Sequence, residues 1–231
     1  MKAYVITILG HTLSEYAADN CIESSVKLKN PFNIQKFEAV TPLETGEIMK
    51  DYGIEWNYPW DGNVYDFKSG LKKSAYVTRD PLARIACALS HYKLWHMCQD
   101  LDEPFLVLEH DAIFQRHLDP EYIIESKFNI VGLNDPIGAT RRSRSFHDKV
   151  QNSNKDITPV PNIDNFDVPQ GLAGNSAYII KPAGASAVIE AVDDYGLWPN
   201  DAIMCKQLIK RMGVTKKYYT QVQGLPSTTT E

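Results

Sequence analysis

The first 40 residues combine two kinds of apolar pattern. Residues 2–9 (KAYVITIL) form a continuous run rich in β-formers, and the next segment spaces Leu13, Ala17 and Cys21 as on one face of a helix. A second β-type run follows at residues 34–40 (IQKFEAV). Strand, helix and strand in this order predict a βαβ unit, which is the seed of a parallel sheet.

The most strongly marked helix is expected after Asp80. This residue is suited to the N-cap, Pro81 to the first helical position, and residues 82–101 are apolar on most helical faces. Residues 103–111 (EPFLVLEHD) then have the continuous apolar character of a strand in a buried parallel sheet. The pattern therefore predicts a buried helix that leads into a buried strand with charged residues at its carboxyl end.

Further elements are expected in the C-terminal half. The pattern favours strands at residues 128–134 and 175–181, helices at 182–196 and 200–213, and a last strand at 214–223. Two long stretches are expected to be irregular, residues 41–80 and 135–170; the first, rich in aromatic residues, is either a packed surface flap or a loop that covers a ligand. Together the elements predict one α/β domain over residues 1–224, with a mostly parallel central sheet flanked by helices, and a polar tail at 225–231.

Composition narrows the class of protein. The 231 residues are 43% hydrophobic and 23% charged, as in globular proteins. The net charge of −5 and the pI near 5.7 disfavour nucleic-acid binding unless basic side chains gather on one face. The cysteines are widely spaced without a CxxC pair, which argues against a zinc site and a disulfide framework. Because the first residues have neither signal-peptide anatomy nor a membrane span, a cytoplasmic protein is expected, of undetermined oligomeric state.

The segment LVLEHDAIF, residues 106–114, carries the clearest candidate chemistry. Ligands of open parallel sheets bind at the carboxyl ends of the strands, where Glu109 and Asp111 are expected. Carboxylates suit Mn²⁺ or Mg²⁺, ions that commonly join one or two protein carboxylates to the phosphates of a substrate. Acid pairs also occur at strand ends as solvated loop starts, so the triplet alone leaves both interpretations open.

Three segments occur together in a characteristic order. The first is a helix with Cys87, Leu89, Ser90, His91 and Trp95, followed by the strand that ends at Glu109 and Asp111. The second is GLAGNSAYIIKPAGASAVIEA (residues 171–191), and the third is LWPNDAIM (residues 197–204). In this order they resemble glycosyltransferase family 25, the lipooligosaccharide and procollagen galactosyltransferase type, over most of residues 80–205.

The resemblance implies a GT-A-like fold and an enzyme, a hexosyl- or pentosyltransferase. Such an enzyme moves a sugar, with inversion, from a nucleoside-diphosphate donor, foremost UDP, to a hydroxyl of a saccharide acceptor. The resemblance also implies that Glu109 and Asp111 bind Mn²⁺ or Mg²⁺ and that a carboxylate acts as the base. We assign the base to Asp201 at the start of a predicted helix, where the dipole favours ionisation; a simple helix cap is the alternative.

The chain departs from the family pattern at three places, of which Ala86, where the family usually has glycine on the helix, is a mild change. His110 stands in the middle of the acid triplet, and the arginine-rich turn expected after the first strand is missing. Donor phosphate contacts must then come from other residues, with Lys72 and Lys73 among the candidates. The donor-binding candidates are Thr7, Arg79, Arg84, Ser90, His91 and Glu109. Ser90 and His91 are also consistent with a packing role on a buried helix.

A basic segment, RRSRSFHDK (residues 141–149), interrupts the otherwise acidic chain. Its arginines Arg141, Arg142 and Arg144 are candidates for binding a phosphate or an anionic acceptor, and Trp198 for contacting the acceptor; a solvated loop and a core aromatic are the alternatives. The basic segment keeps open a second acceptor, a hydroxymethylated base in DNA as in phage-type DNA modification. A third hypothesis is a non-catalytic nucleotide-sugar-binding protein, motivated by His110 and the missing arginines.

Overall fold

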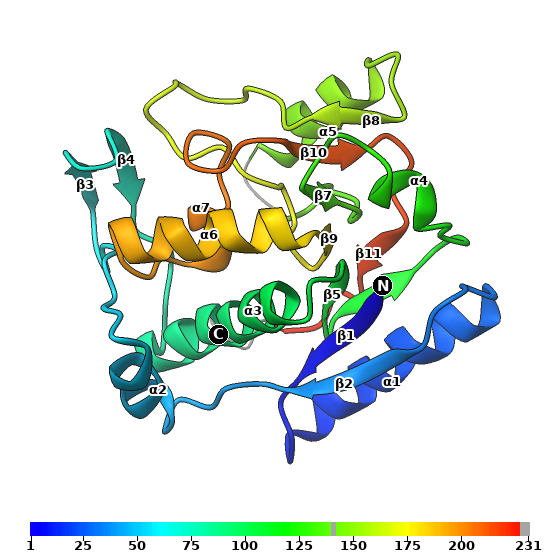
Figure 1. Ribbon diagram of the computed structural model, residues 1–231, viewed down its shortest axis with the longest axis horizontal. Helices are drawn as coiled ribbons and strands as arrows, with labels where there is room; N and C mark the ends of the chain where they lie inside the picture. Colours follow the sequence, from blue (N-terminus) through cyan, green and yellow to red (C-terminus); the bar gives the residue numbers. More distant parts are fainter. Residues whose placement is uncertain (140–141, 227–231) are drawn as a thin grey trace.

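The centre of the molecule is a seven-stranded sheet in the order β2-β1-β5-β9-β7-β10-β8 (Figure 1). The computed structural model describes residues 1–139 and 142–226. The strands are β1 (Lys2–Thr7), β2 (Ile34–Glu38), β5 (Phe105–Glu109), β7 (Ile130–Gly132), β8 (Ile157–Pro159), β9 (Ala177–Ile180) and β10 (Met212–Thr215). All but β8 and β9 run in one direction, because only these two pair antiparallel with their neighbours. The predicted α/β fold with a mostly parallel sheet is confirmed.

Strand β5 lies inside the sheet and divides the core into two layers. Its side chains alternate, so that Phe105 and Val107 pack with one cluster while Leu106 and Leu108 pack with the other. Helices α3 (Pro81–Asp100) and α6 (Pro182–Tyr195) supply the first cluster. Helices α1 (Thr12–Lys27) and α4 (Glu121–Ile124) supply the second. By this alternation Glu109, the last residue of β5, falls on the same face as Phe105 and Val107, which α3 covers.

Helix α3 begins where the sequence predicts. The side chain of Asp80 accepts a hydrogen bond from the backbone N–H of Leu82 at 2.9 Å, and Pro81 is the first helical residue. The helix is buried over much of its circumference, since Ala88, Leu94 and other residues on different faces are covered. It therefore presents side chains both to the core and to the carboxyl end of β5.

The stretch of residues 41–80 contains more regular structure than predicted. It forms helix α2 (Thr45–Tyr52) and a hairpin of β3 (Asn63–Asp66) and β4 (Leu71–Ser74). The ammonium group of Lys73 is almost fully buried there, 3.3 Å from the carboxylate of Asp66, 2.7 Å from the carbonyl of Asn57 and 4.7 Å from the ring centre of Trp198. One buried cation thus holds the hairpin against the body of the protein.

The predicted helix at residues 200–213 is wrong in length. Helix α7 (Asn200–Ile203) is only one turn, because the backbone N–H of Lys206 donates to the carbonyl of Gln170 at 3.0 Å and Cys205 bridges to Gly171 instead of continuing the helix. The predicted last strand splits into β10 and β11 (Thr220–Val222), and β11 pairs with β6 (Ala112–Phe114). The stretch 135–170, predicted to be irregular, includes α5 (Ser143–Gln151) and β8.

Candidate active site

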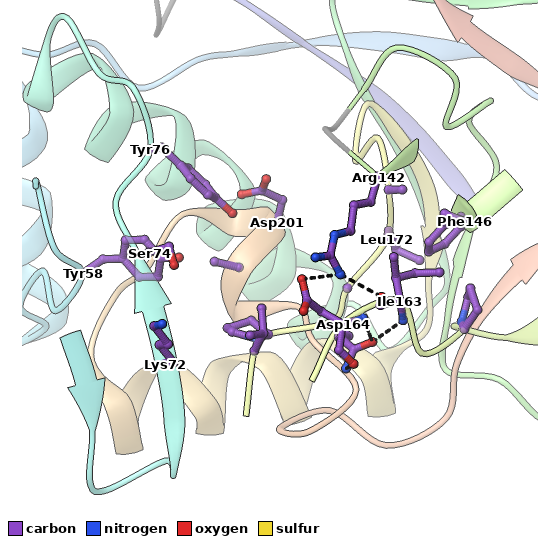
Figure 2. Close-up of a pocket in the computed structure, with 17 residues that line it drawn as sticks. Tyr58, Lys72, Ser74, Tyr76, Arg142, Phe146, Ile163, Asp164, Leu172 and Asp201 are labelled. Atoms are coloured by element: carbon purple, nitrogen blue, oxygen red, sulfur yellow. Dashed lines mark hydrogen bonds and ion pairs between the residues drawn. The ribbon is translucent and has the colours of Figure 1, made fainter. Parts of the chain in front are cut away.

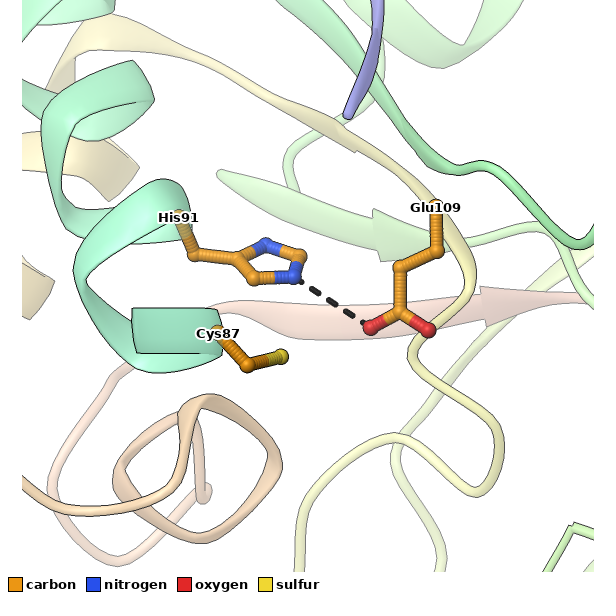
Figure 3. Close-up of side chains that lie close together, drawn as sticks. All are labelled: Cys87, His91 and Glu109. Atoms are coloured by element: carbon orange, nitrogen blue, oxygen red, sulfur yellow. Dashed lines mark hydrogen bonds and ion pairs between the residues drawn. The ribbon is translucent and has the colours of Figure 1, made fainter. Parts of the chain in front are cut away.

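Three side chains with ligand chemistry converge at the carboxyl end of β5 (Figure 3). They are Cys87 and His91, one turn apart on α3, and Glu109; one candidate ligand atom from each lies within 4.8 Å of the others. The register of α3 against β5 brings them together, since the helix runs back over the face on which Glu109 projects. The sequence named Glu109 and His91 as site residues but gave Cys87 no role at the site.

The carboxylate of Glu109 is engaged through both oxygens. His91 Nε2 lies 3.3 Å from Oε1, and the hydroxyl of Ser176 donates to Oε2 at 3.4 Å. Burial acts to raise the pKa of Glu109, but the hydrogen bond from His91 and the electrostatic interaction with His91 and His110 outweigh it and lower the pKa below its usual value. Glu109 is therefore an ionised carboxylate with a fixed orientation.

Asp111 lies in the turn after β5 and has a different environment. Its Oδ1 atom is buried and has no hydrogen-bond partner among the described residues. Burial, followed by repulsion from Glu109, raises the pKa of Asp111 to about 7. A second carboxylate that is costly to ionise beside an ionised one is an arrangement that a divalent cation would relieve.

A cavity of about 470 Å³ opens onto Glu109. Its walls come from the end of β1, the start of α1, the segment after β2 and the first half of α3, and they are largely apolar. The lining includes Ile8, Leu13, Val40, Pro42, Ala83 and Ala86; its polar groups besides Glu109 are His11, Thr41, Asp80, Cys87, Ser90, His91 and His110. No lysine or arginine of the described residues lines it. Pro226, in the predicted polar tail, also contacts this cavity.

Asp201 lies in a second cavity, of about 360 Å³ (Figure 2). Burial is the main cause that raises the pKa of Asp201, and Glu109 adds to it while Arg84 and Tyr76 oppose it. The expectation that a helix dipole favours ionisation is thus outweighed by burial. The cap alternative has no support either, because Pro199 is the N-cap of α7 and no side chain caps this helix.

The second cavity is lined by aromatic and planar polar side chains. Tyr58 and Tyr76 stand on one side, while Arg142 faces Asp164 on the other (Figure 2). The Cys87 thiol, in the lining of the first cavity, lies 3.9 Å from the side-chain oxygen of Asn200, at the start of α7. Asn200 precedes Asp201, which lines the second cavity, so residues of the two cavities come close where α3 contacts α7.

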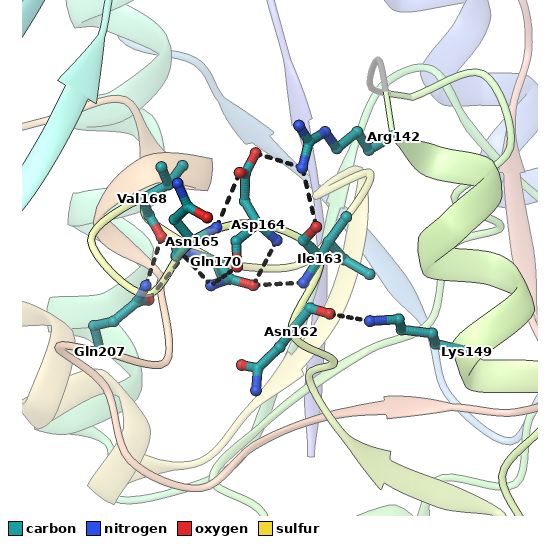
Figure 4. A network of polar contacts seen from close by, with 9 residues as sticks. All are labelled: Arg142, Lys149, Asn162, Ile163, Asp164, Asn165, Val168, Gln170 and Gln207. Carbon is teal, nitrogen blue, oxygen red and sulfur yellow. Dashed lines mark hydrogen bonds and ion pairs between the residues drawn. The ribbon is translucent and has the colours of Figure 1, made fainter.

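A polar network holds the segment 160–170 over the second cavity (Figure 4). Arg142 Nη1 donates to the carboxylate of Asp164 at 2.8 Å and to the carbonyl of Ile163 at 3.0 Å. The side-chain oxygen of Gln170 accepts from the backbone N–H groups of Ile163 and Asp164, at 2.6 and 3.2 Å. Gln207 donates to the carbonyls at the other end of the segment. Arg142 is thus a wall of the cavity and is already paired within the protein.

The remaining predicted residues lie in varied positions. Thr7 is fully buried and its hydroxyl donates to the carbonyl of Val5, while Ser90 lines the first cavity but donates to Ala86 and accepts from the N–H of Val40. Arg84 donates to Thr78 and to the carbonyl of Val77. Arg79 and Arg144 are exposed, and neither lines the two cavities. Arg141 lies outside the described residues.

Trp198 is fully buried, with its ring against Tyr58 and under the ammonium group of Lys73, and its N–H donates to the carbonyl of Tyr195 at 3.0 Å. This position gives it a packing role rather than acceptor contact. Lys73 is likewise committed to the hairpin, whereas Lys72 lines the second cavity.

The sequence missed several residues that lie at the site. Ser176 precedes β9, and its carbonyl accepts the N–H of Glu109 at 2.8 Å. Tyr58 and Tyr76 come from the stretch predicted to be irregular. Only the antiparallel pairing of β5 with β9 and the packing of the hairpin bring these groups to the site, and local sequence carries no signal for either.

The chain matches the family model described as glycosyltransferase family 25 (LPS biosynthesis protein) over residues 20–204. No curated protein matches it. Among the described residues, no helix is both long and apolar enough to span a membrane.

Several solved glycosyltransferase structures are similar in outline. One is involved in the glycosylation of the major capsid of PBCV-1, with 8% identity, coverage of 98% of this chain and 95% of that one, and a TM-score of 0.43. Another is mouse xyloside xylosyltransferase 1 in the apo form, with 8% identity, coverage of 88% and 80%, and a TM-score of 0.45. A third is the bifunctional WbbM, with 12% identity, coverage of 92% and 38%, and a TM-score of 0.44.

Proposed function

Since the chain belongs to glycosyltransferase family 25, we propose that this glycosyltransferase is metal-dependent and inverting, and that it moves a sugar from a UDP-type donor to a saccharide hydroxyl. The observation that carries the proposal is the pair of carboxylates at the end of β5. Glu109 is ionised and borders the first cavity, while the nearby Asp111 keeps a buried oxygen that has no hydrogen-bond partner in the described part of the chain.

We infer that Glu109 and Asp111 hold Mn²⁺ or Mg²⁺. The donor set is all oxygen, which these hard ions prefer, and a bound cation would give Asp111 Oδ1 the partner it lacks among the described residues. When bound, the ion supplies positive charge that stabilises the nucleoside diphosphate as it leaves.

The first cavity is our proposed donor site. Its apolar walls suit the nucleobase and ribose of the donor. The start of α1, with His11 as its N-cap, also lines the cavity and offers the positive end of a helix dipole to phosphate. Since no lysine or arginine of the described residues lines this cavity, charge compensation for a diphosphate falls on the carboxylate-bound cation and on histidines. This supports metal dependence.

Asp201 is our proposed base, with the acceptor in the second cavity. Its raised pKa makes the carboxylate a stronger proton acceptor than an exposed aspartate. The acceptor oxygen forms a bond to the anomeric carbon, the bond from that carbon to the donor phosphate breaks, and the acceptor proton passes to Asp201. Attack from the face opposite the leaving group inverts the anomeric centre.

A donor panel tests this proposal. Purified protein is incubated with UDP-, GDP-, CDP- and dTDP-sugars, with Mn²⁺ or with EDTA, and nucleotide release is measured. Turnover of one UDP-sugar that EDTA abolishes is expected, with a loss of at least about 100-fold in Asp111→Asn and in Asp201→Asn, a size typical of general-base and electrostatic contributions. The exposed Asp61→Asn is the control. Turnover that resists EDTA would refute metal dependence, and full activity of Asp201→Asn would refute the role of Asp201 as the catalytic base.

The same panel separates the two acceptors. Saccharides and duplex DNA with hydroxymethylated bases are each offered with the active donor, at two salt concentrations. Sugar transfer to DNA that weakens steeply with salt would replace the saccharide proposal. The pairing of Arg142 with Asp164 favours the saccharide, because a paired arginine contributes little net charge toward a polyanion.

A further inference from the structure

A chain of hydrogen bonds runs through the core to Glu109. The indole N–H of Trp95 donates to the hydroxyl of Tyr178 at 2.9 Å, and this hydroxyl lies 2.8 Å from His91 Nδ1. On the other side of the imidazole, Nε2 lies 3.3 Å from Glu109 Oε1 (Figure 3). Two residues come from α3 and one from β9, so the chain joins two elements before it reaches the site.

The direction of this chain follows from the chemistry of its first member. An indole nitrogen can only donate, so the Tyr178 oxygen accepts from Trp95. The hydroxyl hydrogen of Tyr178 is then free to donate, and His91 Nδ1 is the acceptor within reach. A neutral imidazole that accepts at Nδ1 carries its hydrogen on Nε2, which therefore donates to Glu109.

The chain of hydrogen bonds lies in the core, where burying polar groups costs free energy of folding. Trp95, His91 and Tyr178 are each 0% exposed, and apolar side chains of similar size would fill the same space without any need for partners. Every polar group in the chain is satisfied, and its end lies at the border of the first cavity. Such a network makes physical sense if its effect is on Glu109.

We propose that Trp95 and Tyr178 fix the Nε2–H tautomer of His91, and that His91 thereby fixes the orientation of the Glu109 carboxylate for a divalent cation. This inference rests on the proposed metal site. His91 is then a positioning residue and not a metal ligand, because the nitrogen that faces Glu109 carries a hydrogen. Of the three converging groups, His91 and Glu109 are hydrogen-bonded to each other, whereas the Cys87 thiol contacts Asn200; in this proposal only the carboxylate serves as a metal ligand.

Two variants of His91 separate this role from simple packing. In His91→Gln the amide nitrogen takes the place of Nε2 and keeps a donor for Glu109. In His91→Asn the amide oxygen keeps an acceptor for Tyr178, but no donor from position 91 reaches Glu109 Oε1. Both remove the ring, so both lose a similar amount of packing. Mn²⁺ affinity is measured directly from the free-ion EPR signal, without any sugar donor, and thermal melting reports stability.

We expect His91→Gln to bind Mn²⁺ within about threefold of the parent and His91→Asn to bind about 10–100-fold more weakly, the range for groups that orient a metal ligand. Equal affinities in the two variants would overturn the positioning role and leave the metal site standing. A parent that binds no Mn²⁺ would overturn both this role and the metal site.

A second measurement needs no variant of His91. Nitrogen NMR of the His91 ring in the metal-free protein should give a hydrogen-bearing Nε2 and a hydrogen-free Nδ1, and Tyr178→Phe should shift the Nδ1 resonance. A hydrogen on Nδ1 in the parent would reverse the chain and overturn the proposal, even if the His91 variants fail to fold.

Discussion

Replacing Asp111 by asparagine should change how the stability of the metal-free protein depends on pH. The pKa of this carboxyl is raised from 3.8 to about 7, first by burial and then by repulsion from Glu109. At pH values between these two, the folded protein holds a proton that the unfolded chain has lost. Stability therefore falls as pH rises through this window and is constant above it.

The size of this effect follows from the same difference. A rise from 3.8 to about 7 corresponds to a ceiling of about 4 kcal/mol at 1.36 kcal/mol for each pH unit. Asp111 is partly exposed to solvent, which screens both burial and repulsion, so we expect about 1–3 kcal/mol. Asparagine has nearly the same shape and no charge, so the free energy of unfolding of Asp111→Asn should not fall by this amount as the pH rises.

The assay is urea unfolding in EDTA at a series of pH values from 4.5 to 8. The free energy of unfolding of Asp111→Asn, minus that of the parent, should rise by about 1–3 kcal/mol across the series. His110, whose pKa burial lowers, titrates in both proteins and cancels in this difference. Asp61→Asn, at an exposed loop position, should give a flat difference.

If the difference in free energy of unfolding between Asp111→Asn and the parent does not change with pH, the assignment of Asp111 as a buried carboxyl with a raised pKa is refuted. Added Mn²⁺ gives a second readout, since it should stabilise the parent at pH 8 and leave Asp111→Asn unchanged. The substitution would then stabilise the metal-free fold while removing a function, as expected for a group kept for ligand binding.

Three further predictions concern other parts of the molecule. A Cβ at Gly171 would lie 2.8 Å from the carbonyl of Asp201, so Gly171→Ala should lower the free energy of unfolding by about 1–3 kcal/mol and lower kcat. Gly46→Ala, in open space on α2, is the control and should change neither quantity. Thermal melting and turnover measure the two effects. Lys73→Met removes the buried cation of the β3–β4 hairpin and should cost about 3 kcal/mol in urea unfolding, and a cost under about 1 kcal/mol would contradict its role. His110→Asp adds a third carboxylate, so it should tighten Mn²⁺ binding by EPR and lower the melting temperature without metal; unchanged affinity would place residue 110 away from the ion.

Much of the fold can be predicted from the sequence because it depends on local patterns of residues. The Asp80 and Pro81 start of α3, the buried run of β5 and the strand–helix–strand opening are all confirmed. The prediction of a helix at residues 200–213 is wrong because backbone groups that would have continued the helix instead bond to Gly171 and Gln170, which are distant in sequence. Hairpin β3–β4 was missed because both strands are short, β3 is largely exposed, and one of the two buried positions of β4 is occupied by Lys73, so little apolar periodicity remains.

The sequence by itself determined the candidate carboxylates, since a buried strand that ends in Glu109 and Asp111 is a local feature with a known chemical use. Only the tertiary structure decided how those carboxylates differ. Burial and mutual repulsion raise the pKa of Asp111, while His91, on α3, and Ser176, directly before β9, hold Glu109 ionised. These effects depend on distances of a few ångströms between segments far apart in the chain, and no local pattern of residues encodes such distances.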